Sequence, residues 1–323
     1  MKTLARLRAR SDLGVLGTLG MAVLVLGVGS GCDESAPSAG GTGGQITTSS
    51  SQGGNGAGGG GGLPTGGGGT GGTPSAGGGG AGGGGATGGD GGTGGVSGLP
   101  DVRSLVVLGD SIGDGGGVGP FYYELLRQSL QDKYGGTLQY HNNAQSGSET
   151  SALLGQVNGL PQSLPGPVAV TITSGGNDMK AHITEVVAGL DGPVRTAMGD
   201  NIEAAFDALL APNRFGAGVE VHVYEADIYD SSDGQGDFNA HNCAFSFPVA
   251  LPTDTYFASW NGEIADHVGA NGQALADIHT LFYGHGFNNP PSWYASDCTH
   301  PNTTGHDQLR RIFYSLITGE QLP

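Results

Sequence analysis

The residues of this sequence that could perform chemistry lie at two places far apart along the chain. Ser111 follows an apolar run that ends at Gly109, and Asp297 stands three residues before His300. A serine hydroxyl becomes a nucleophile when a histidine takes its proton and a carboxylate orients that histidine. On a tight loop, the Asp297 carboxylate can reach one imidazole nitrogen while the other nitrogen faces the serine. These residues predict hydrolysis through a covalent intermediate on serine.

Such chemistry also needs hydrogen-bond donors for the oxygen that becomes negatively charged in the transition state. Gly147 can offer an unobstructed backbone N–H, and Asn177 can offer its side-chain amide. Taken singly, Gly147 could be a turn glycine, Asn177 a helix cap and His300 a surface residue. Their occurrence together with Ser111 favours a catalytic interpretation.

The elements that must position these residues alternate between strands and helices. Apolar runs predict strands at 104–108, 138–141, 168–172 and 219–228, and helical spacing predicts helices over 120–134, 202–210, 264–281 and 309–316. This alternation is typical of a three-layer α/β domain, a parallel sheet with helices on both faces. Ligands bind beyond the carboxyl ends of such strands, so Ser111 and Asn177 should lie at the same rim.

Four blocks, in this order, resemble the SGNH (GDSL-type) hydrolase family: Gly109-Asp110-Ser111-Ile112, the glycine block around Gly147, Gly175-Gly176-Asn177-Asp178 and Asp297-Cys298-Thr299-His300. The resemblance spans the whole folded part and implies a flavodoxin-like fold and a serine esterase without a cofactor. It implies that Ser111 is the nucleophile, His300 the general base and Asp297 its orienting partner. It also implies that the oxyanion donors are the backbone N–H groups of Ser111 and Gly147 and the side chain of Asn177.

The substrate is expected to be a small-molecule or glycan ester with a short acyl or acetyl group. The acidic domain and the absence of a long apolar lid-like segment favour short acyl groups. The alternatives are a lipase or thioesterase that takes long acyl chains, and a surface-binding lipoprotein that has lost catalysis.

Charge and the remaining polar motifs narrow the classes of partner. The chain has 12 Lys+Arg against 29 Asp+Glu, a net charge of −17, which argues against nucleic acid and against an anionic membrane surface. We expect a monomer.

The histidines show no metal-ligand spacing, and no catalytic metal is expected. The acidic segment 230–237 does not fit the EF-hand register and is predicted to be a solvated loop, while 113–119 is predicted to be a flexible rim of the active site.

The amino terminus resembles an export signal. A basic start is followed by an apolar run from Leu13 to Gly29 and then by Ser30-Gly31-Cys32, similar to a bacterial lipoprotein cleavage box. Residues 1–32 are therefore predicted to be a signal peptide, with lipidation at Cys32 as the only membrane attachment of a cell-envelope lipoprotein. Gly29 departs from the usual aliphatic residue of that box, and the alternative is cleavage and secretion.

Residues 33–98 are half glycine, 33 of 66, and contain no aromatic residue. Such a segment cannot bury enough apolar surface to offset the entropy of ordering it, and we predict a disordered linker. The remaining residues, 101–323, are of a length that suits one domain.

The cysteines agree with export. With Cys32 assigned to the lipid, Cys243 and Cys298 form one possible disulfide in an oxidising compartment. The alternative is two buried free thiols.

Overall fold

The computed structural model describes residues 98–241, 243 and 252–322. The predicted signal peptide, Cys32 and residues 33–97 of the predicted linker lie outside these ranges. None of the helices within the described ranges combines the length and apolar character that crossing a membrane would require.

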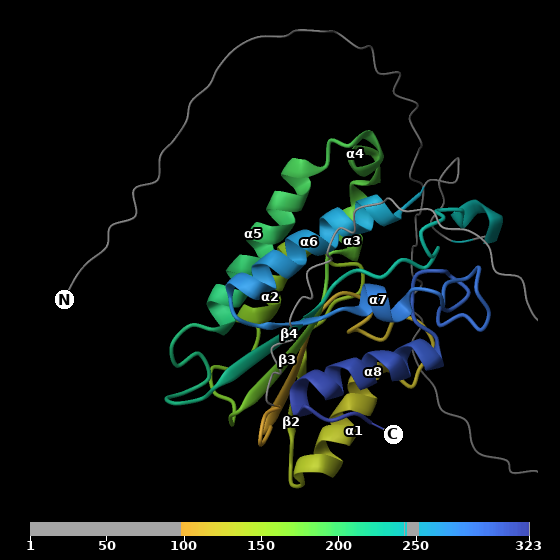
Figure 1. The fold of residues 1–323 in the computed structure, drawn as a ribbon. Helices are drawn as coiled ribbons and strands as arrows, with labels where there is room; N and C mark the ends of the chain where they lie inside the picture. Colours follow the sequence, from red (N-terminus) through yellow and green to blue (C-terminus); the bar gives the residue numbers. More distant parts are fainter. Residues whose placement is uncertain (1–97, 242, 244–251, 323) are drawn as a thin grey trace, which may run out of the picture. The chain divides into compact units, whose positions relative to one another are not determined.

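Five parallel strands form one sheet in the described part of the chain (Figure 1). They are β1 (Ser104–Gly109), β2 (Gln139–Asn142), β3 (Val168–Thr173), β4 (Val221–Ala226) and β5 (Ala274–Ala276). Their order across the sheet is β2-β1-β3-β4-β5, which is the order of the flavodoxin-like doubly wound fold.

Helices cover both faces of this sheet (Figure 1). The helices are α1 (Tyr122–Tyr134), α2 (Leu153–Asn158), α3 (Gly176–Ala181), α4 (Ile183–Ala188), α5 (Gly192–Leu209), α6 (Asp254–Ala270), α7 (Ile278–Phe282) and α8 (Thr303–Thr318), with short 3₁₀ turns η1 (Thr150–Ala152) and η2 (Phe238–His241). One core contains buried side chains of α2, α5 and α6, and the other contains those of α1, α7 and α8. The three-layer α/β fold predicted from the sequence is confirmed.

β1 and β3 are largely apolar because both of their faces are covered. On β1, Val106 and Leu108 belong to the core under α2, α5 and α6, whereas Leu105 and Val107 belong to the opposite core. Successive side chains of a strand point to opposite faces, so a strand between two helical layers favours apolar residues on both faces. This explains the apolar runs that mark β1 and β3 in the sequence.

The single helix predicted over 264–281 is wrong. The structure instead has the end of α6, the strand β5 and the short helix α7. Gly272 has a φ of +64° and ends the helical path, after which Ala274 pairs with Tyr224 of β4. Asp277 then caps α7 by accepting a hydrogen bond from the Thr280 N–H at 2.9 Å. A three-residue strand between two helices is too short for its apolar spacing to differ from that of a helix.

The solvated loop predicted at 230–237 is also wrong, because two of its three acidic side chains, Asp230 and Asp233, are buried. Asp230 is 2% exposed and accepts hydrogen bonds from the backbone N–H groups of Ser232 and Gly234. Asp233 is 7% exposed and accepts from the N–H groups of Gly284 and Gly286. The carboxylates satisfy backbone donors that the turns leave unpaired, which is why a polar segment lies inside the domain.

Candidate active site

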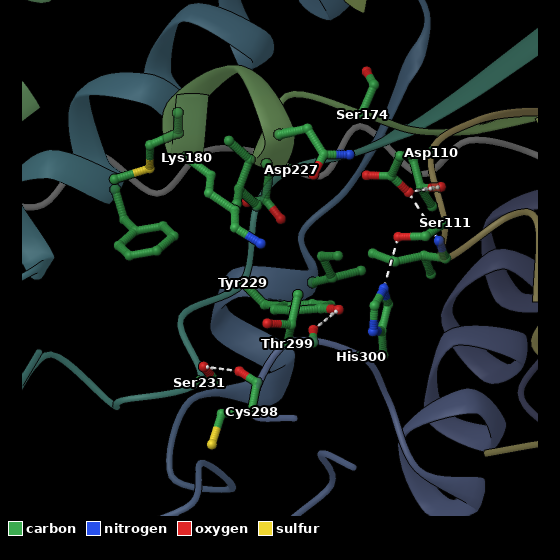
Figure 2. A pocket seen from close by; sticks show the side chains of 18 of the residues that line it. Asp110, Ser111, Ser174, Lys180, Asp227, Tyr229, Ser231, Cys298, Thr299 and His300 are labelled. Atoms are coloured by element: carbon green, nitrogen blue, oxygen red, sulfur yellow. Dashed lines mark hydrogen bonds between the residues drawn. The ribbon is translucent and has the colours of Figure 1, made fainter. Parts of the chain in front are cut away.

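The predicted site residues leave neighbouring strand ends at one rim of the sheet. β1 and β3 pair in register up to Gly109 and Thr173, and Ser111 and Asn177 follow two and four residues later. The two residues line one cavity together with His300, as Figure 2 shows for Ser111 and His300. The topology therefore brings together residues that lie nearly 190 positions apart in the chain.

Ser111, His300 and Asp297 form one chain of hydrogen bonds. His300 Nε2 lies 2.8 Å from Ser111 Oγ, and His300 Nδ1 lies 2.6 Å from Asp297 Oδ2. The other carboxylate oxygen of Asp297 accepts the backbone N–H groups of Thr299 and His300, each at 3.0 Å. The predicted folding of the carboxylate back onto the imidazole is present.

The charge state of Asp297 follows from these contacts. Partial burial would raise the pKa of Asp297, but the backbone and side-chain hydrogen bonds from His300 and the backbone hydrogen bond from Thr299 outweigh it and lower the pKa below its usual value. An ionised Asp297 keeps a proton on His300 Nδ1, so Nε2 is left to accept the proton of the Ser111 hydroxyl. The arrangement can therefore activate a serine nucleophile.

The three groups predicted as oxyanion donors are the backbone N–H groups of Ser111 and Gly147 and the Asn177 amide. Within the described residues, neither the Ser111 nor the Gly147 backbone N–H has an acceptor. Asn177 Nδ2 donates to Ser148 O at 2.9 Å, which leaves its second N–H available. Gly147 is not among the residues that line the cavity, but its neighbour Ser148 is held to Gly109 O by its hydroxyl at 3.0 Å. Gly147 has a φ of +77°, a conformation that favours glycine.

The segment predicted as a rim, 113–119, lies against His300. A Cβ on Gly116 would lie only 2.5 Å from His300 Cδ2, and a Cβ on Gly117 would lie 2.1 Å from Pro301 O. Gly116 N–H also donates to Ser111 O at 2.6 Å. The glycines are needed here because the backbone passes too close to the histidine loop for any side chain.

Two further polar side chains hold the segments around the site in place: Gln156, which no sequence motif marks, and Asp178, which belongs to the block that contains Asn177. Gln156 of α2 accepts the Gly109 N–H at 2.7 Å and donates to Gly109 O at 2.8 Å, which fixes the backbone two residues before Ser111. Asp178, next to Asn177, accepts the Thr150 N–H at 2.9 Å and the Thr150 hydroxyl at 2.5 Å. No spacing pattern marks Gln156, since its role depends on where α2 packs.

Asp110 shapes the turn that carries the serine. It is 6% exposed, and its Oδ1 accepts the Ile112 N–H at 3.0 Å and the Thr173 hydroxyl at 3.1 Å. Burial raises the pKa of Asp110 to about 6, although these hydrogen bonds and the nearby His300 oppose the rise.

The cavity beside Ser111 is mostly apolar (Figure 2). Its volume is about 140 Å³. The apolar side chains that line it come from the loops after β1 and β4 and from η2, α3, α4, α6 and α7: Ile112, Met179, Ile183, Ile228, Tyr229, Phe238, Tyr256, Phe257 and Ile278. An engineered apolar cavity of about 150 Å³ holds a benzene molecule, so this cavity fits an apolar group of about six carbons.

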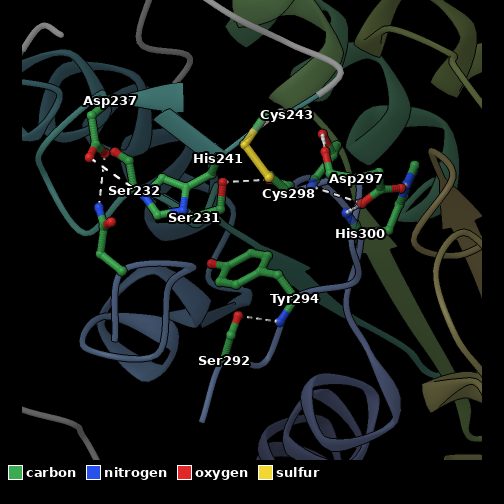
Figure 3. Close-up of a disulfide and its surroundings, with 12 residues drawn as sticks. Ser231, Ser232, Asp237, His241, Cys243, Ser292, Tyr294, Asp297, Cys298 and His300 are labelled. Carbon is green, nitrogen blue, oxygen red and sulfur yellow. Dashed lines mark hydrogen bonds and ion pairs between the residues drawn. A yellow bond between two sulfur atoms is a disulfide. The ribbon is translucent and has the colours of Figure 1, made fainter. Parts of the chain in front are cut away.

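A disulfide joins Cys243 and Cys298, the pair predicted from the sequence (Figure 3). Cys298 lies between Asp297 and His300 and has a φ of +59°. Its carbonyl accepts the Ser231 hydroxyl at 2.5 Å, and the neighbouring Thr299 carbonyl accepts the Tyr229 hydroxyl at 2.6 Å. The loop that carries the acid and the base is therefore tied to the segment after β4 by one covalent bond and two hydrogen bonds.

Metal ligation has no support among the described side chains, where no group of three or more His, Cys, Asp or Glu residues could hold an ion.

Comparison with known proteins gives a family match. The model of the GDSL-like Lipase/Acylhydrolase family matches residues 107–308. No curated protein matches the sequence. Three solved structures are similar to this chain. Lipase Lip_vut3 from a goat rumen metagenome is 17% identical with a TM-score of 0.49, and the match covers 66% of this chain and 96% of that chain. An extracellular lipase from Streptomyces rimosus is 20% identical with a TM-score of 0.46, and the match covers 66% of this chain and 99% of that chain. A variant of an acetyl xylan esterase from Geobacillus stearothermophilus is 19% identical with a TM-score of 0.46, and the match covers 70% of this chain and 99% of that chain.

Proposed function

This chain belongs to the GDSL-like lipase/acylhydrolase family, whose members act on ester bonds, and we propose that it hydrolyses short-chain carboxylic esters through an acyl-enzyme on Ser111. The observation that carries the proposal is the pair of short contacts made by His300. Its Nε2 lies 2.8 Å from Ser111 Oγ and its Nδ1 lies 2.6 Å from Asp297 Oδ2. The first distance suits proton transfer from the serine to the histidine during attack on the ester, and the second lets the carboxylate orient the imidazole.

In the first half of the reaction, Ser111 Oγ attacks the carbonyl carbon of the ester while His300 Nε2 takes the hydroxyl proton. The carbonyl oxygen becomes an oxyanion that accepts hydrogen bonds from the backbone N–H groups of Ser111 and Gly147 and from the Asn177 amide. The C–O bond to the alcohol then breaks, and His300 gives its proton to the departing oxygen. An acyl group remains bound to Ser111.

In the second half, a water molecule replaces the alcohol. His300 takes a proton from the water as its oxygen attacks the acyl carbon, and the same donors stabilise the second oxyanion. The bond to Ser111 Oγ breaks, His300 returns the proton to Oγ, and a carboxylic acid leaves. Asp297 stays ionised throughout and stabilises the imidazolium that forms twice.

The cavity supports short acyl groups. At about 140 Å³ it accommodates roughly six carbons. Each methylene of the acyl group that its apolar wall buries favours binding by about 0.8 kcal/mol, which is about fourfold in affinity. A chain of twelve or more carbons would have to extend beyond this volume. We therefore propose short acyl groups, because carbons beyond about the sixth gain no further burial in this cavity.

The test is a series of p-nitrophenyl esters from acetate to palmitate, assayed beside acetate release from acetylated polysaccharides. We expect kcat/KM to peak between the acetate and hexanoate esters and to fall at least tenfold by the dodecanoate ester. The Ser111→Ala protein, assayed with every ester, serves as the control for background hydrolysis. A maximum at the dodecanoate or palmitate ester would support the long-chain alternative instead.

We also propose export, with Cys32 as the lipid anchor. A disulfide persists in oxidising compartments, and the sequence before Cys32 is similar to a lipoprotein signal. When the full chain is expressed in a bacterium, esterase activity should sediment with membranes, and a Cys32→Ser change should release it to the soluble fraction. Equal soluble activity of both proteins would favour cleavage and secretion.

A further inference from the structure

We propose that His306, outside the set of residues assigned to the reaction, is a positioning residue that holds the His300 imidazole through the Gly116 peptide. The inference rests on the proposed function, since it concerns the geometry of the base in that reaction. Three features carry it: the burial of His306, its fixed tautomer and the closeness of Gly116 to His300.

His306 lies in the first turns of α8, six residues after His300. It is fully buried. The Phe121 ring lies edge-on to it with centroids 5.3 Å apart, and the Tyr122 ring is stacked at 6.5 Å. A histidine enclosed by aromatic rings at a helix interface could be a packing residue only, but its two nitrogens both have directional partners.

The hydrogen bonds of His306 fix which nitrogen carries the proton. The Tyr122 backbone nitrogen lies 3.4 Å from Nδ1 and can only donate, so Nδ1 accepts and carries no proton. Nε2 is then protonated in the neutral ring and donates to Gly116 O at 3.0 Å. Burial, assisted by the nearby His300, lowers the pKa of His306 to about 4 against the opposing hydrogen bond to Gly116. The ring is neutral at physiological pH and acts as a fixed donor.

Gly116 transmits this restraint to the catalytic base. Its carbonyl is held by His306, and its N–H donates to Ser111 O at 2.6 Å. A Cβ at this residue would lie 2.5 Å from His300 Cδ2 and 2.8 Å from Nε2, so the peptide lies against the edge of the ring that faces Ser111. A shift of Gly116 therefore changes the contact between His300 Nε2 and Ser111 Oγ, and misplacement of a reacting group by about 1 Å costs on the order of 100-fold in rate.

The test compares two substitutions of His306 that differ in the donor they retain. His306→Phe keeps the ring but removes both hydrogen bonds, whereas His306→Gln keeps an N–H donor at a similar reach. We expect His306→Phe to lower kcat for p-nitrophenyl acetate by about 30- to 100-fold with KM within about twofold, and His306→Gln to recover at least about tenfold of that loss.

A matched control is Phe313→Leu on the same helix, which alters a fully buried ring stacked on Tyr122 without touching Gly116. It should lower the temperature of unfolding while leaving kcat within about twofold, because it changes only packing between α1 and α8. A His306→Phe protein that loses stability but keeps its kcat would overturn the proposal. If the His306→Phe protein does not fold, His306→Asn replaces it, because the shorter amide of asparagine does not reach Gly116. A kcat of His306→Asn equal to that of His306→Gln would then overturn the proposal.

Labelling of Ser111 by an organophosphonate separates this proposal from the function itself. The wild-type protein should be labelled on Ser111, and His306→Phe should be labelled more slowly by a factor similar to its loss of kcat. Absence of labelling in the wild-type protein would contradict the proposed function. Labelling of both proteins at the same rate would contradict only the role of His306.

Discussion

Glu225 on β4 should make the stability of the domain depend strongly on pH, and Glu225→Gln should remove the part of that dependence that Glu225 contributes. The side chain is fully buried. Its Oε1 accepts the Ser174 hydroxyl at 2.9 Å, and its Oε2 has no partner among the described residues. Burial raises the pKa of Glu225 to about 8, with only the Ser174 hydrogen bond acting against it. At a pH between 4.5 and about 8, the Glu225 side chain is therefore a protonated carboxyl in the folded domain and a carboxylate in the unfolded chain.

The sign and size of the effect follow from the two pKa values. The pKa of Glu225 is about 8 in the folded domain and 4.5 in the unfolded chain. The stability that the protonated carboxyl gives the folded domain is therefore fully present below pH 4.5 and is lost as the pH rises through 8. The difference between the two pKa values corresponds to about 5 kcal/mol of stability, an upper figure, of which about 3 kcal/mol is lost between pH 6 and pH 9. Asp227, whose pKa burial also raises to about 8, adds to the pH dependence of both proteins, so the comparison with Glu225→Gln isolates Glu225.

The assay is urea unfolding at pH 6 and pH 9. Glutamine keeps the acceptor for Ser174, and between the two pH values the wild-type domain should lose about 3 kcal/mol more stability than Glu225→Gln. Asp207→Asn, which removes an exposed carboxylate of α5, should follow the wild type at both pH values. Equal losses of stability in the wild-type and Glu225→Gln proteins between pH 6 and pH 9 would show that Glu225 does not have a raised pKa in the folded domain.

Three further outcomes follow from the site. Asn177→Ala should lower kcat by about 100-fold with little change in KM, because the Asn177 amide binds negative charge that appears only in the transition state. If steady-state kinetics showed a defect in KM alone, Asn177 would act in substrate recognition instead. Asp297→Asn should lower kcat by about 10³- to 10⁴-fold while the fold, followed by circular dichroism, is retained, since the imidazole loses the partner that sets its tautomer; a loss under tenfold would contradict that role. Cys243→Ser should lower both the temperature of unfolding and turnover, because the disulfide closes a loop of 55 residues worth up to about 4 kcal/mol; unchanged turnover in a destabilised protein would show that the bond does not position His300.

The parts of the site that the sequence predicts are those set by local spacing and by strand ends. Ser111 and Asn177 lie within four residues of the ends of two paired strands, and parallel strands place their carboxyl ends at one rim, so their proximity follows from topology alone. Asp297 and His300 are three residues apart, and their contact is set within one loop. Each of these predictions needs only the immediate chain neighbours or the order of elements.

The parts that the sequence does not predict depend on packing between distant segments. Gln156 and His306 are ordinary helix residues until α2 and α8 dock, and only then do they reach Gly109 and Gly116. The burial of Asp233 likewise depends on the N–H groups of a segment about 50 residues later. No local pattern of apolar or charged residues encodes such partners.

If Ser111 carries the acyl group, an organophosphonate ester should modify its hydroxyl, and intact-mass analysis of the treated protein followed by peptide mapping locates the adduct. We expect a single adduct on the peptide containing Ser111 and no adduct on Ser111→Ala. That variant should remain folded and lose several orders of magnitude of ester hydrolysis. An adduct on another residue, or a Ser111→Ala protein that keeps more than about a tenth of wild-type turnover, would contradict this role of Ser111.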